Sequence, residues 1–249
     1  MTDPVIRWAI EPSTAVLAGI DSPLAALPAE QRARADRLRQ ARDRDDFIAA
    51  RLLTQRLVAQ VTGRPAPFTQ SCDHCGGPHG RPVVDSAELH LSWSHAGGWV
   101  AAVVSDQPCG IDVEPVNDRP PLFDVLSAEE QQAIRSLPES QQPNAFLRLW
   151  VRKEALAKAA GTGLTDQTAL AQLDVRDDDV TYADQHWHLT DLDAPDGVVA
   201  AIVRRGSGRP RRFPSQVGFR NRAGVETLRR RLPRHLAGKQ VIYQPRPGA

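Results

Sequence analysis

Two carboxylates separated by one residue, Asp112 and Glu114, have the spacing of a possible metal site. The surrounding segment 110–115 (GIDVEP) alternates apolar and acidic residues and predicts a short strand. Residues i and i+2 of a strand share a face, so both carboxylates point the same way. Mg²⁺ in proteins commonly binds one or two carboxylates together with water and substrate phosphates. The alternative is a solvated strand end without a ligand.

A second pattern with possible chemistry is the segment 150–158 (WVRKEALAK), which predicts a helix. Trp150, Glu154 and Lys158 follow each other at intervals of four and lie broadly on one face. A surface Glu–Lys pair would give the same pattern. Lysine usage favours a specific role, because two of the three lysines among 31 basic residues stand in this segment. Such positions suit a compact ammonium rather than a guanidinium.

Apolar periodicity predicts the elements that carry these residues. We expect a strand at 5–10, one helix over about 30–61, a hairpin of 89–94 with 99–105, and a strand from 110. A capping box at Ser127 and Glu130 predicts a helix to about 137. The strongest helix spans 144–160 and ends at Gly161. A second hairpin is expected from 187–192 with 198–203.

The two hairpins resemble each other: residues 90–103 run parallel to 188–202 at a distance of about 98 residues. If this is an internal duplication, it predicts an α+β fold of two similar α/β lobes related by a pseudo-twofold, with a ligand cleft between them. The alternative is a chance likeness, since β-hairpins resemble one another. We expect an N-terminal lobe at 1–115, a C-terminal lobe at 116–205 and an Arg/Pro-rich basic extension at 206–249.

Charge is unevenly distributed along the chain of 249 residues, although the net charge is only +1. From Arg204 to the end there are thirteen basic residues and one acid, Glu226, so the remaining 203 residues carry a net −11. This acidic body argues against nucleic-acid binding. There is no apolar run of ~18 residues for a membrane span and no signal peptide pattern. Three cysteines make no disulfide framework, and we expect a cytoplasmic protein.

The pairing of GIDVE with WxxKEAxxK about forty residues later resembles the signature of the 4′-phosphopantetheinyl transferases. Length and spacing are similar to the larger, two-lobed monomeric type that activates surfactin synthetase. Further similar motifs are 91–95 (LSWSH), 80–82 (GRP) and 50–53 (ARLL), so the resemblance covers about 27–165.

The resemblance implies that Asp112, Glu114 and Glu154 hold Mg²⁺ against the pyrophosphate of coenzyme A. It implies Glu154 as the base for a carrier serine and Lys158 as the group that stabilises the leaving phosphate or orients Glu154. Coenzyme A contacts are implied for Arg51, Arg81, Ser94, His95, Lys158 and Asp112. Arg81 stands where lysine is usual, and an arginine can still bind phosphate.

The implied reaction moves phosphopantetheine from coenzyme A to a serine of an acidic apo carrier protein and releases adenosine 3′,5′-bisphosphate. We expect a monomer that contacts neither nucleic acid nor membrane. Two rivals are a non-catalytic carrier-binding homologue and a nucleic-acid-binding protein led by the basic tail. The presence of all three acids and Lys158 disfavours the first rival.

Two segments fall outside this scheme. Cys72, Cys75 and His79 could contribute to a zinc site, but a second ligand pair is missing and a tight turn with reduced thiols is the alternative. The basic extension 206–249 is expected to be a solvated tail, to dock on the acidic body, or to recruit the acidic carrier.

Overall fold

The computed structural model describes residues 6–71, 76–77, 80–84, 88–162 and 167–206. Two antiparallel sheets and a set of helices form one unit over the described residues between Ile6 and Gly206. The fold is α+β, as predicted. In the described part of the chain no helix is both long and apolar enough to cross a bilayer.

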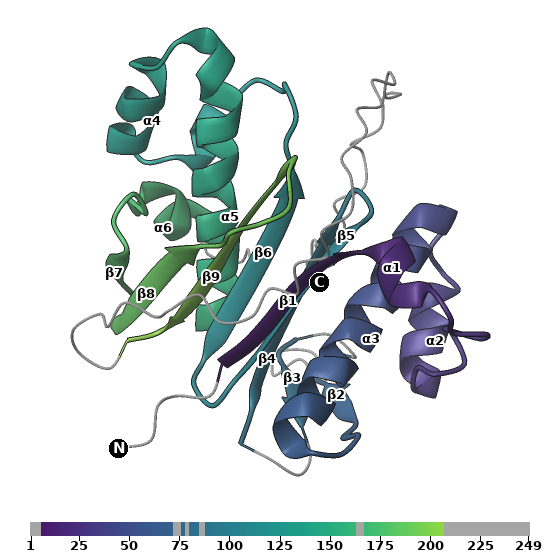
Figure 1. Cartoon of the computed structure of the whole chain (residues 1–249). Helices are drawn as coiled ribbons and strands as arrows, with labels where there is room; N and C mark the ends of the chain where they lie inside the picture. Colours follow the sequence, from purple (N-terminus) through teal and green to yellow (C-terminus); the bar gives the residue numbers. More distant parts are fainter. Residues whose placement is uncertain (1–5, 72–75, 78–79, 85–87, 163–166, 207–249) are drawn as a thin grey trace, which may run out of the picture. The chain divides into compact units, whose positions relative to one another are not determined.

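The first sheet has five strands and the second has four (Figure 1). In spatial order the first sheet contains β1 (Ile6–Pro12), β5 (Trp99–Ser105), β4 (His90–Ala96), β3 (Pro82–Val84) and β2 (Phe68–Gln70). The second contains β6 (Cys109–Pro115), β9 (Val198–Arg205), β8 (Gln185–Asp191) and β7 (Asp179–Tyr182). Both expected hairpins are therefore confirmed as paired strands.

Six α-helices and two short 3₁₀ turns accompany the described strands. The α-helices are α1 (Ser13–Leu17), α2 (Ala29–Ala35), α3 (Ala41–Thr62), α4 (Ala128–Arg135), α5 (Gln142–Ala160) and α6 (Gln167–Gln172). The 3₁₀ turns are η1 (Phe123–Val125) and η2 (Glu139–Gln141). The capping box of α4 is confirmed, with both Ser127–Glu130 hydrogen bonds present.

The prediction of a single helix over about 30–61 is wrong, because the helix is interrupted between α2 and α3. The break spans Asp36–Gln40, which contains one apolar side chain, Leu38, and this side chain packs against the core. A helix through this stretch would have no apolar stripe to bury, so packing against the core would stabilise it little.

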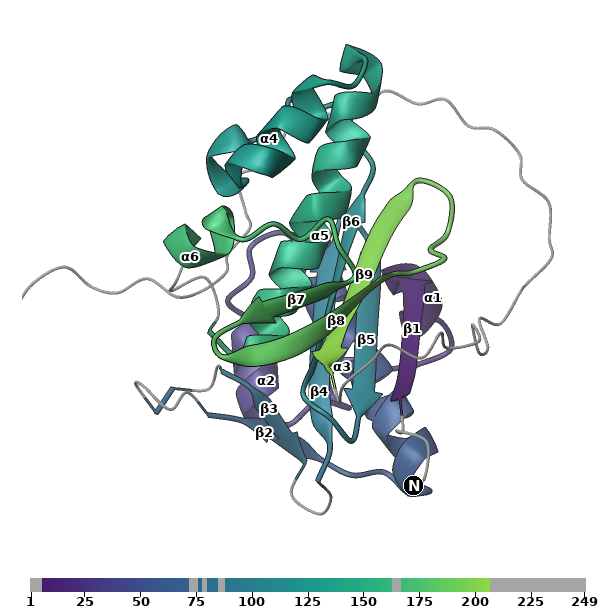
Figure 2. The same ribbon diagram turned by 90° about the vertical axis from the view of Figure 1, so that its left-hand side faces the viewer.

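The sheets lie between the two long helices (Figures 1 and 2). α3 packs on the first sheet and α5 on the second, each with its own apolar cluster. A third cluster fills the space between the sheets and is formed mainly by β5, β6 and β9, with Val103, Ile111 and Ile202 among its members. Helix α5, which carries Glu154 and Lys158, packs against one side of β6. The first sheet packs against the other side of the same strand.

Strand register repeats between the two sheets. Pro12 at the end of β1 pairs with Trp99, and Pro115 at the end of β6 pairs with Val198. His90 pairs with Ser105 in the first sheet, and His188 pairs with Arg204 in the second. The two similar sequence segments thus occupy corresponding strands. The lobe boundary at 115 and the cleft stay predictions, and β6 itself belongs to the second sheet.

Candidate active site

The site begins at β6, an edge strand whose pairing partner in the second sheet is β9. At Ile111 the edge away from β9 faces β4 and α5: the backbone N–H donates to Ser92 Oγ at 3.2 Å and the carbonyl accepts from Lys158 Nζ at 3.1 Å. A strand edge normally leaves such backbone groups unpaired. Here side chains satisfy them, and this brings β4 and α5 to the position of Asp112.

Asp112 is buried and held from two elements. Its Oδ1 accepts hydrogen bonds from Ser94 Oγ of β4 at 2.6 Å and from Lys158 Nζ of α5 at 2.7 Å. Among the described residues its second oxygen, Oδ2, has no hydrogen-bond partner. An unpaired buried carboxylate oxygen is costly and marks a place where a ligand can bind.

Glu154 faces the same region from α5, one turn before Lys158. It is 7% exposed, and within the described chain its Oε1 also lacks a hydrogen-bond partner. Burial raises the pKa of Glu154 to about 7, the charge of Asp112 adds to this rise, and Lys158 opposes it. A carboxyl group that titrates near neutrality can accept a proton under working conditions.

Glu114 shares the Asp112 face of β6 and is 6% exposed. The buried carboxylates of Asp112 and Glu154 thus lie near the Lys158 ammonium, and Glu114 is buried on the same face of β6. Among the described residues no three acidic, histidine or cysteine side chains stand close enough together to hold a metal ion as they are. The excess of negative charge nevertheless suits a bound cation.

The predicted coenzyme A ligands are spread over several elements. Ser94 is engaged with Asp112, whereas His95 follows it on β4, points to the other face of the strand and is exposed. Arg81 precedes β3 and donates from Nη2 to the carbonyl of Ala159 at the end of α5. The structure thus brings Asp112, Glu154, Lys158 and Ser94 together, and places His95 and Arg81 at other positions.

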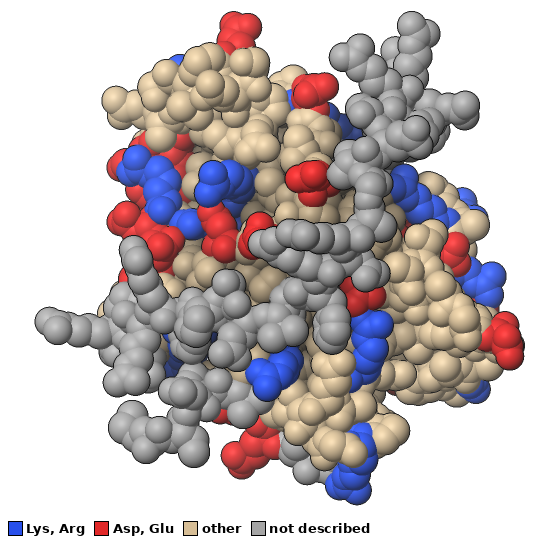
Figure 3. Space-filling view, viewed as in Figure 1, with Lys and Arg blue, Asp and Glu red and all other residues tan. Residues whose placement is uncertain are grey.

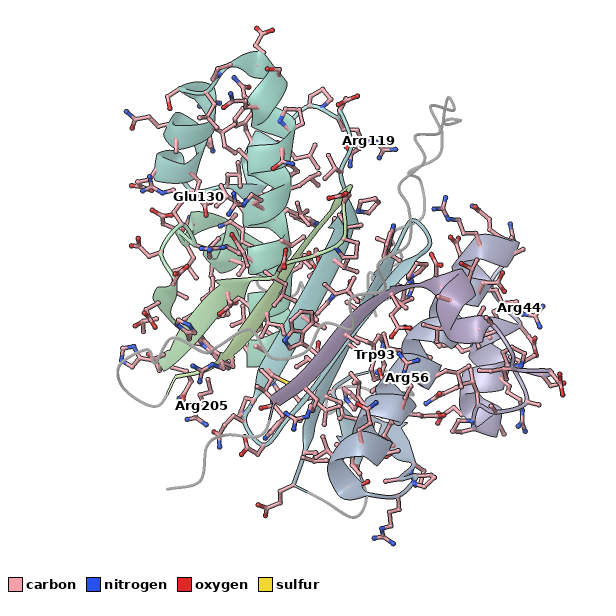
Figure 4. All side chains as sticks on the ribbon, viewed as in Figure 1. Arg44, Arg56, Trp93, Arg119, Glu130 and Arg205 are labelled. Carbon is pink, nitrogen blue, oxygen red and sulfur yellow. The ribbon has the colours of Figure 1, made fainter. Side chains whose placement is uncertain are left out.

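Arg51 lies on α3 in the first-sheet core rather than beside Asp112. It is 3% exposed, with its guanidinium carbon 3.2 Å from the Phe47 ring centroid and 5.0 Å from that of Trp93, which Figure 4 labels. Burial lowers its pKa well below the ordinary value, and the nearby charge of Arg34 acts in the same direction. Its Nη1 donates to the Phe47 carbonyl at 3.0 Å.

Gly110 begins the GIDVE motif, but the sequence interpretation gave it no role of its own. A Cβ at this position would overlap the carbonyl oxygen of Ala155 and would lie 2.6 Å from the backbone N of Ala159. Glycine therefore permits the contact of β6 with α5 that sets Asp112 against Lys158. The sequence signal was present, since a glycine inside a strand often marks close backbone approach.

Lys153 and Glu130 form a second charged group that was not foreseen. Lys153 Nζ lies 3.0 Å from Glu130 Oε2, and their side chains are 2% and 0% exposed. Figure 4 places Glu130 on the side of the molecule where α4 and α5 meet. Lys153 also donates to the carbonyls of Leu170 and Leu173, which fixes the end of α6. This pair is on a different face of α5 from Glu154.

Arg152, which precedes Lys153, connects α5 to the end of β8 and to the segment before β7. Its guanidinium bonds Asp191 at 2.7 Å and Asp178 at 3.0 Å. On the face shown in Figure 3, basic and acidic side chains lie next to one another below α4. The ion pairs of Arg152 join α5 to β8 and to the segment before β7.

One predicted group of metal ligands lies in a part of the chain that the structure does not describe. The possible zinc ligands Cys72, Cys75 and His79 lie outside the described residues. The remaining cysteine, Cys109, is buried in β6 with its Sγ 3.5 Å from the His90 carbonyl, and burial raises its pKa to about 12.

Comparison with known proteins identifies relatives over the part of the chain that holds this site. A family model described as the 4′-phosphopantetheinyl transferase superfamily matches residues 108–203. The chain is 32% identical to 4′-phosphopantetheinyl transferase psf-1 of Bacillus pumilus over 55% of its own length and 58% of that protein. It is 26% identical to a 4′-phosphopantetheinyl transferase of Bacillus subtilis over 74% and 78%, respectively. It therefore spans a little more than half of the first relative.

Fold and site together define an α+β protein with a buried carboxylate–lysine site where an edge strand meets a long helix. The matched residues 108–203 include β6, which carries Asp112, and α5, which carries Glu154 and Lys158. Over these elements the chain is similar to the 4′-phosphopantetheinyl transferase superfamily.

Proposed function

We propose that this protein transfers the 4′-phosphopantetheine group of coenzyme A to a serine of an apo carrier protein of the acyl, polyketide or peptidyl kind. Adenosine 3′,5′-bisphosphate is the second product. The observation that carries the proposal is the buried surplus of carboxylates around Lys158, with unpartnered oxygens on Asp112 and Glu154 among the described residues. The similarity of residues 108–203 to the superfamily supports the same activity.

The donor set at this site fits Mg²⁺. Buried carboxylate oxygens with vacant acceptor positions suit a hard divalent cation that keeps water and phosphate ligands. We assign Asp112, Glu114 and Glu154 as the residues that would hold it. When bound, the ion would offset the negative charge of the coenzyme A pyrophosphate.

Glu154 is the proposed base. With a pKa of about 7, a large share of its carboxyl groups is deprotonated at neutral pH and able to accept the proton of the carrier serine. As the serine oxygen bonds to the β-phosphorus of coenzyme A, the bond from that phosphorus to the bridging oxygen breaks. Its electron pair leaves with adenosine 3′,5′-bisphosphate.

Lys158 has two proposed duties. Its Nζ bonds Asp112 Oδ1 and the Ile111 carbonyl, so it holds Asp112 in place. Its side chain is 29% exposed, which leaves the ammonium accessible to the leaving phosphate. Positioning and charge then supply most of the rate enhancement.

Ser94, His95, Arg51 and Arg81 remain our proposed contacts for the phosphates of coenzyme A. Ser94 is the member of this group that already lies at the carboxylate site. We further propose that the protein acts as a cytoplasmic monomer on carriers with acidic surfaces.

The test incubates the chain with coenzyme A, Mg²⁺ and an apo carrier protein and determines the carrier mass. We expect the carrier to gain one phosphopantetheine group, and we expect no gain with EDTA or with Glu154→Gln. A carrier that binds the wild-type chain without gaining mass would support the non-catalytic homologue instead.

A further inference from the structure

The two long helices end in the same way but meet different surroundings. α3 ends at Gly63 and α5 at Gly161, with φ angles of +73° and +75°. Among the described residues no atom lies within 4 Å of the place where a Cβ on Gly63 would stand. The corresponding position at Gly161 lies 2.7 Å from Nη2 and 3.1 Å from Cζ of Arg81. The guanidinium therefore rests on Gly161.

Arg81 is bonded to the last turn of α5. Its Nη2 donates to the carbonyl oxygen of Ala159. The last carbonyls of a helix have no partner within the helix and carry partial negative charge, so a cation is favourable there. Arg81 immediately precedes β3 of the first sheet, whereas α5 packs on the second sheet. This contact is a tie between elements of the two sheets.

The contact of Arg81 with Ala159 lies next to Lys158, the proposed catalytic lysine of α5. Lys158 precedes Ala159 directly, and its Nζ must reach Asp112 Oδ1 and the Ile111 carbonyl. A shift of the last helical turn would move the Lys158 backbone and lengthen both contacts. A displacement of about 1 Å at a catalytic group can cost up to roughly 100-fold in rate.

We propose that Arg81 is a positioning residue, which fixes the last turn of α5 so that Lys158 meets Asp112, and that Gly161 is required because a side chain there would displace the guanidinium. The proposal rests on the proposed transfer function for its kinetic consequence. It is independent of whether the remaining donors of Arg81 also contact coenzyme A.

A matched pair of variants tests it: Gly161→Asn and Gly63→Asn. Asparagine tolerates the left-handed conformation, so both variants bear a similar backbone cost. At 161 the new side chain also takes the space of the Arg81 guanidinium. We expect Gly161→Asn to lower kcat roughly 10-fold, within the range for a displaced group, with a smaller change in KM for coenzyme A. Gly63→Asn should keep wild-type kcat.

Three kinetic results would overturn the proposal. The first is an equal loss of kcat in both variants, which would indicate a general effect of losing a terminal glycine. The second is a raised KM for coenzyme A with unchanged kcat, which would make Arg81 a ligand contact alone. The third is wild-type kinetics in Gly161→Asn.

Variants of Arg81 test the same contact from its other side. Arg81→Gln should lower kcat as Gly161→Asn does, and Arg81→Lys, which keeps a cation able to donate to Ala159, should recover part of the loss. In the double variant Arg81→Gln/Gly161→Asn the effect of the second change should vanish. Additive losses of kcat would contradict the proposal.

Hydrogen exchange of the backbone amides at 157–161 supplies a readout that does not require turnover. Exchange there should quicken in Gly161→Asn and in Arg81→Gln, and should stay as in the wild type in Gly63→Asn. If the wild-type chain fails to modify a carrier but these exchange changes occur, the transfer function is wrong and the tie stands. Unchanged exchange at 157–161 in both Arg81→Gln and Gly161→Asn would overturn the tie itself.

Discussion

Lys153 and Lys158 stand five residues apart on α5, and their ammonium groups meet different surroundings. Lys153 is 2% exposed and pairs with Glu130, whose Oε1 accepts from Val175 N and whose Oε2 accepts from Ser127 N, each at 2.9 Å. Burial lowers the pKa of Lys153, and Glu130 acts against this. On the Lys158 side, within the described chain, Asp112 and Glu154 each keep an oxygen without a partner.

The difference separates structural charges from functional ones. A buried ion pair whose hydrogen bonds are complete holds elements together, here α4, α5 and the end of α6. Buried carboxylates with vacant acceptor positions cost stability unless a ligand compensates them. The same helix thus serves the fold on one face and the proposed chemistry on another.

A comparison of the two sheets leads to the same conclusion. Glu11 and Glu114 occupy corresponding places, each just before the proline that ends its strand. Arg56 and Glu154 also correspond, each seven residues before the terminal glycine of its helix. Glu11 forms an ion pair with Arg56, so its charge is neutralised within the chain. The second sheet carries an acid at both places, Glu114 and Glu154, instead of an acid and a base.

The largest expected effect comes from Asp112→Asn, which keeps the shape of the side chain and removes its charge. We expect transfer to fall roughly 100-fold or more, as when a charged group of a metal or transition-state site is lost. The melting temperature should be unchanged or raised, because Glu154 loses a repulsive neighbour. Retained Mg²⁺-dependent turnover would show that the metal assignment is wrong.

Gly110→Ala should come next. The added methyl meets backbone atoms of Ala155 and Ala159, which cannot rotate away, so β6 and α5 must separate. Overpacking of this kind costs about 1–3 kcal/mol, and transfer should fall with it. The control is Gly206→Ala, whose Cβ would have its nearest neighbour at 3.5 Å. Equal unfolding free energies for the two variants would contradict the close-approach argument.

The third expectation concerns stability against pH in EDTA. The folded pKa of Glu154, about 7, lies above the unfolded value, so its carboxylate form disfavours the fold. Its contribution should become steadily less favourable as pH rises from about 4.5 to about 7 and stay so above, by about 3 kcal/mol at most. Denaturant unfolding of the wild type and Glu154→Gln at pH 5 and pH 8 measures this. Parallel pH profiles of the two proteins would refute it.

The smallest effect is expected from deleting 206–249, of which 207–249 lie outside the described residues. If the basic tail recruits an acidic carrier, deletion should raise KM for the carrier a few-fold, leave KM for coenzyme A unchanged and flatten the salt dependence. A drop in melting temperature would instead favour docking on the body. Equal carrier kinetics at low salt would exclude recruitment.

Local patterns predicted much of this arrangement. The stripe on α3, the capping box at Ser127, the end of α5 at Gly161 and the paired hairpins all depend on near neighbours, and the structure confirms them. Three-residue strands such as β2 and β3 were missed because their pairing gives no recognisable period. The break between α2 and α3 depends on how Leu38 meets the core.

The residues of the candidate site likewise fall into those that local spacing predicted and those that depend on long-range packing. Spacing on one strand or one helix indicated Asp112, Glu114, Glu154 and Lys158. The partners that complete it depend on packing between distant segments: Gly110 against Ala155, and Arg81 against Ala159. The scarcity of lysine pointed to both lysines of α5 but could not distinguish the buried pair of Lys153 from the open site of Lys158.

The most direct test of this division is the matched pair Lys153→Met and Lys158→Met, each measured for melting temperature and for carrier modification. Lys153→Met leaves Glu130 buried without its cation, which costs about 3–5 kcal/mol, so its melting temperature should fall sharply. Lys158→Met removes an ammonium whose side chain is 29% exposed, so its melting temperature should fall less than that of Lys153→Met, and it should lose most of its transfer rate. A stable Lys153→Met, or a Lys158→Met that modifies the carrier at the wild-type rate, would contradict the account.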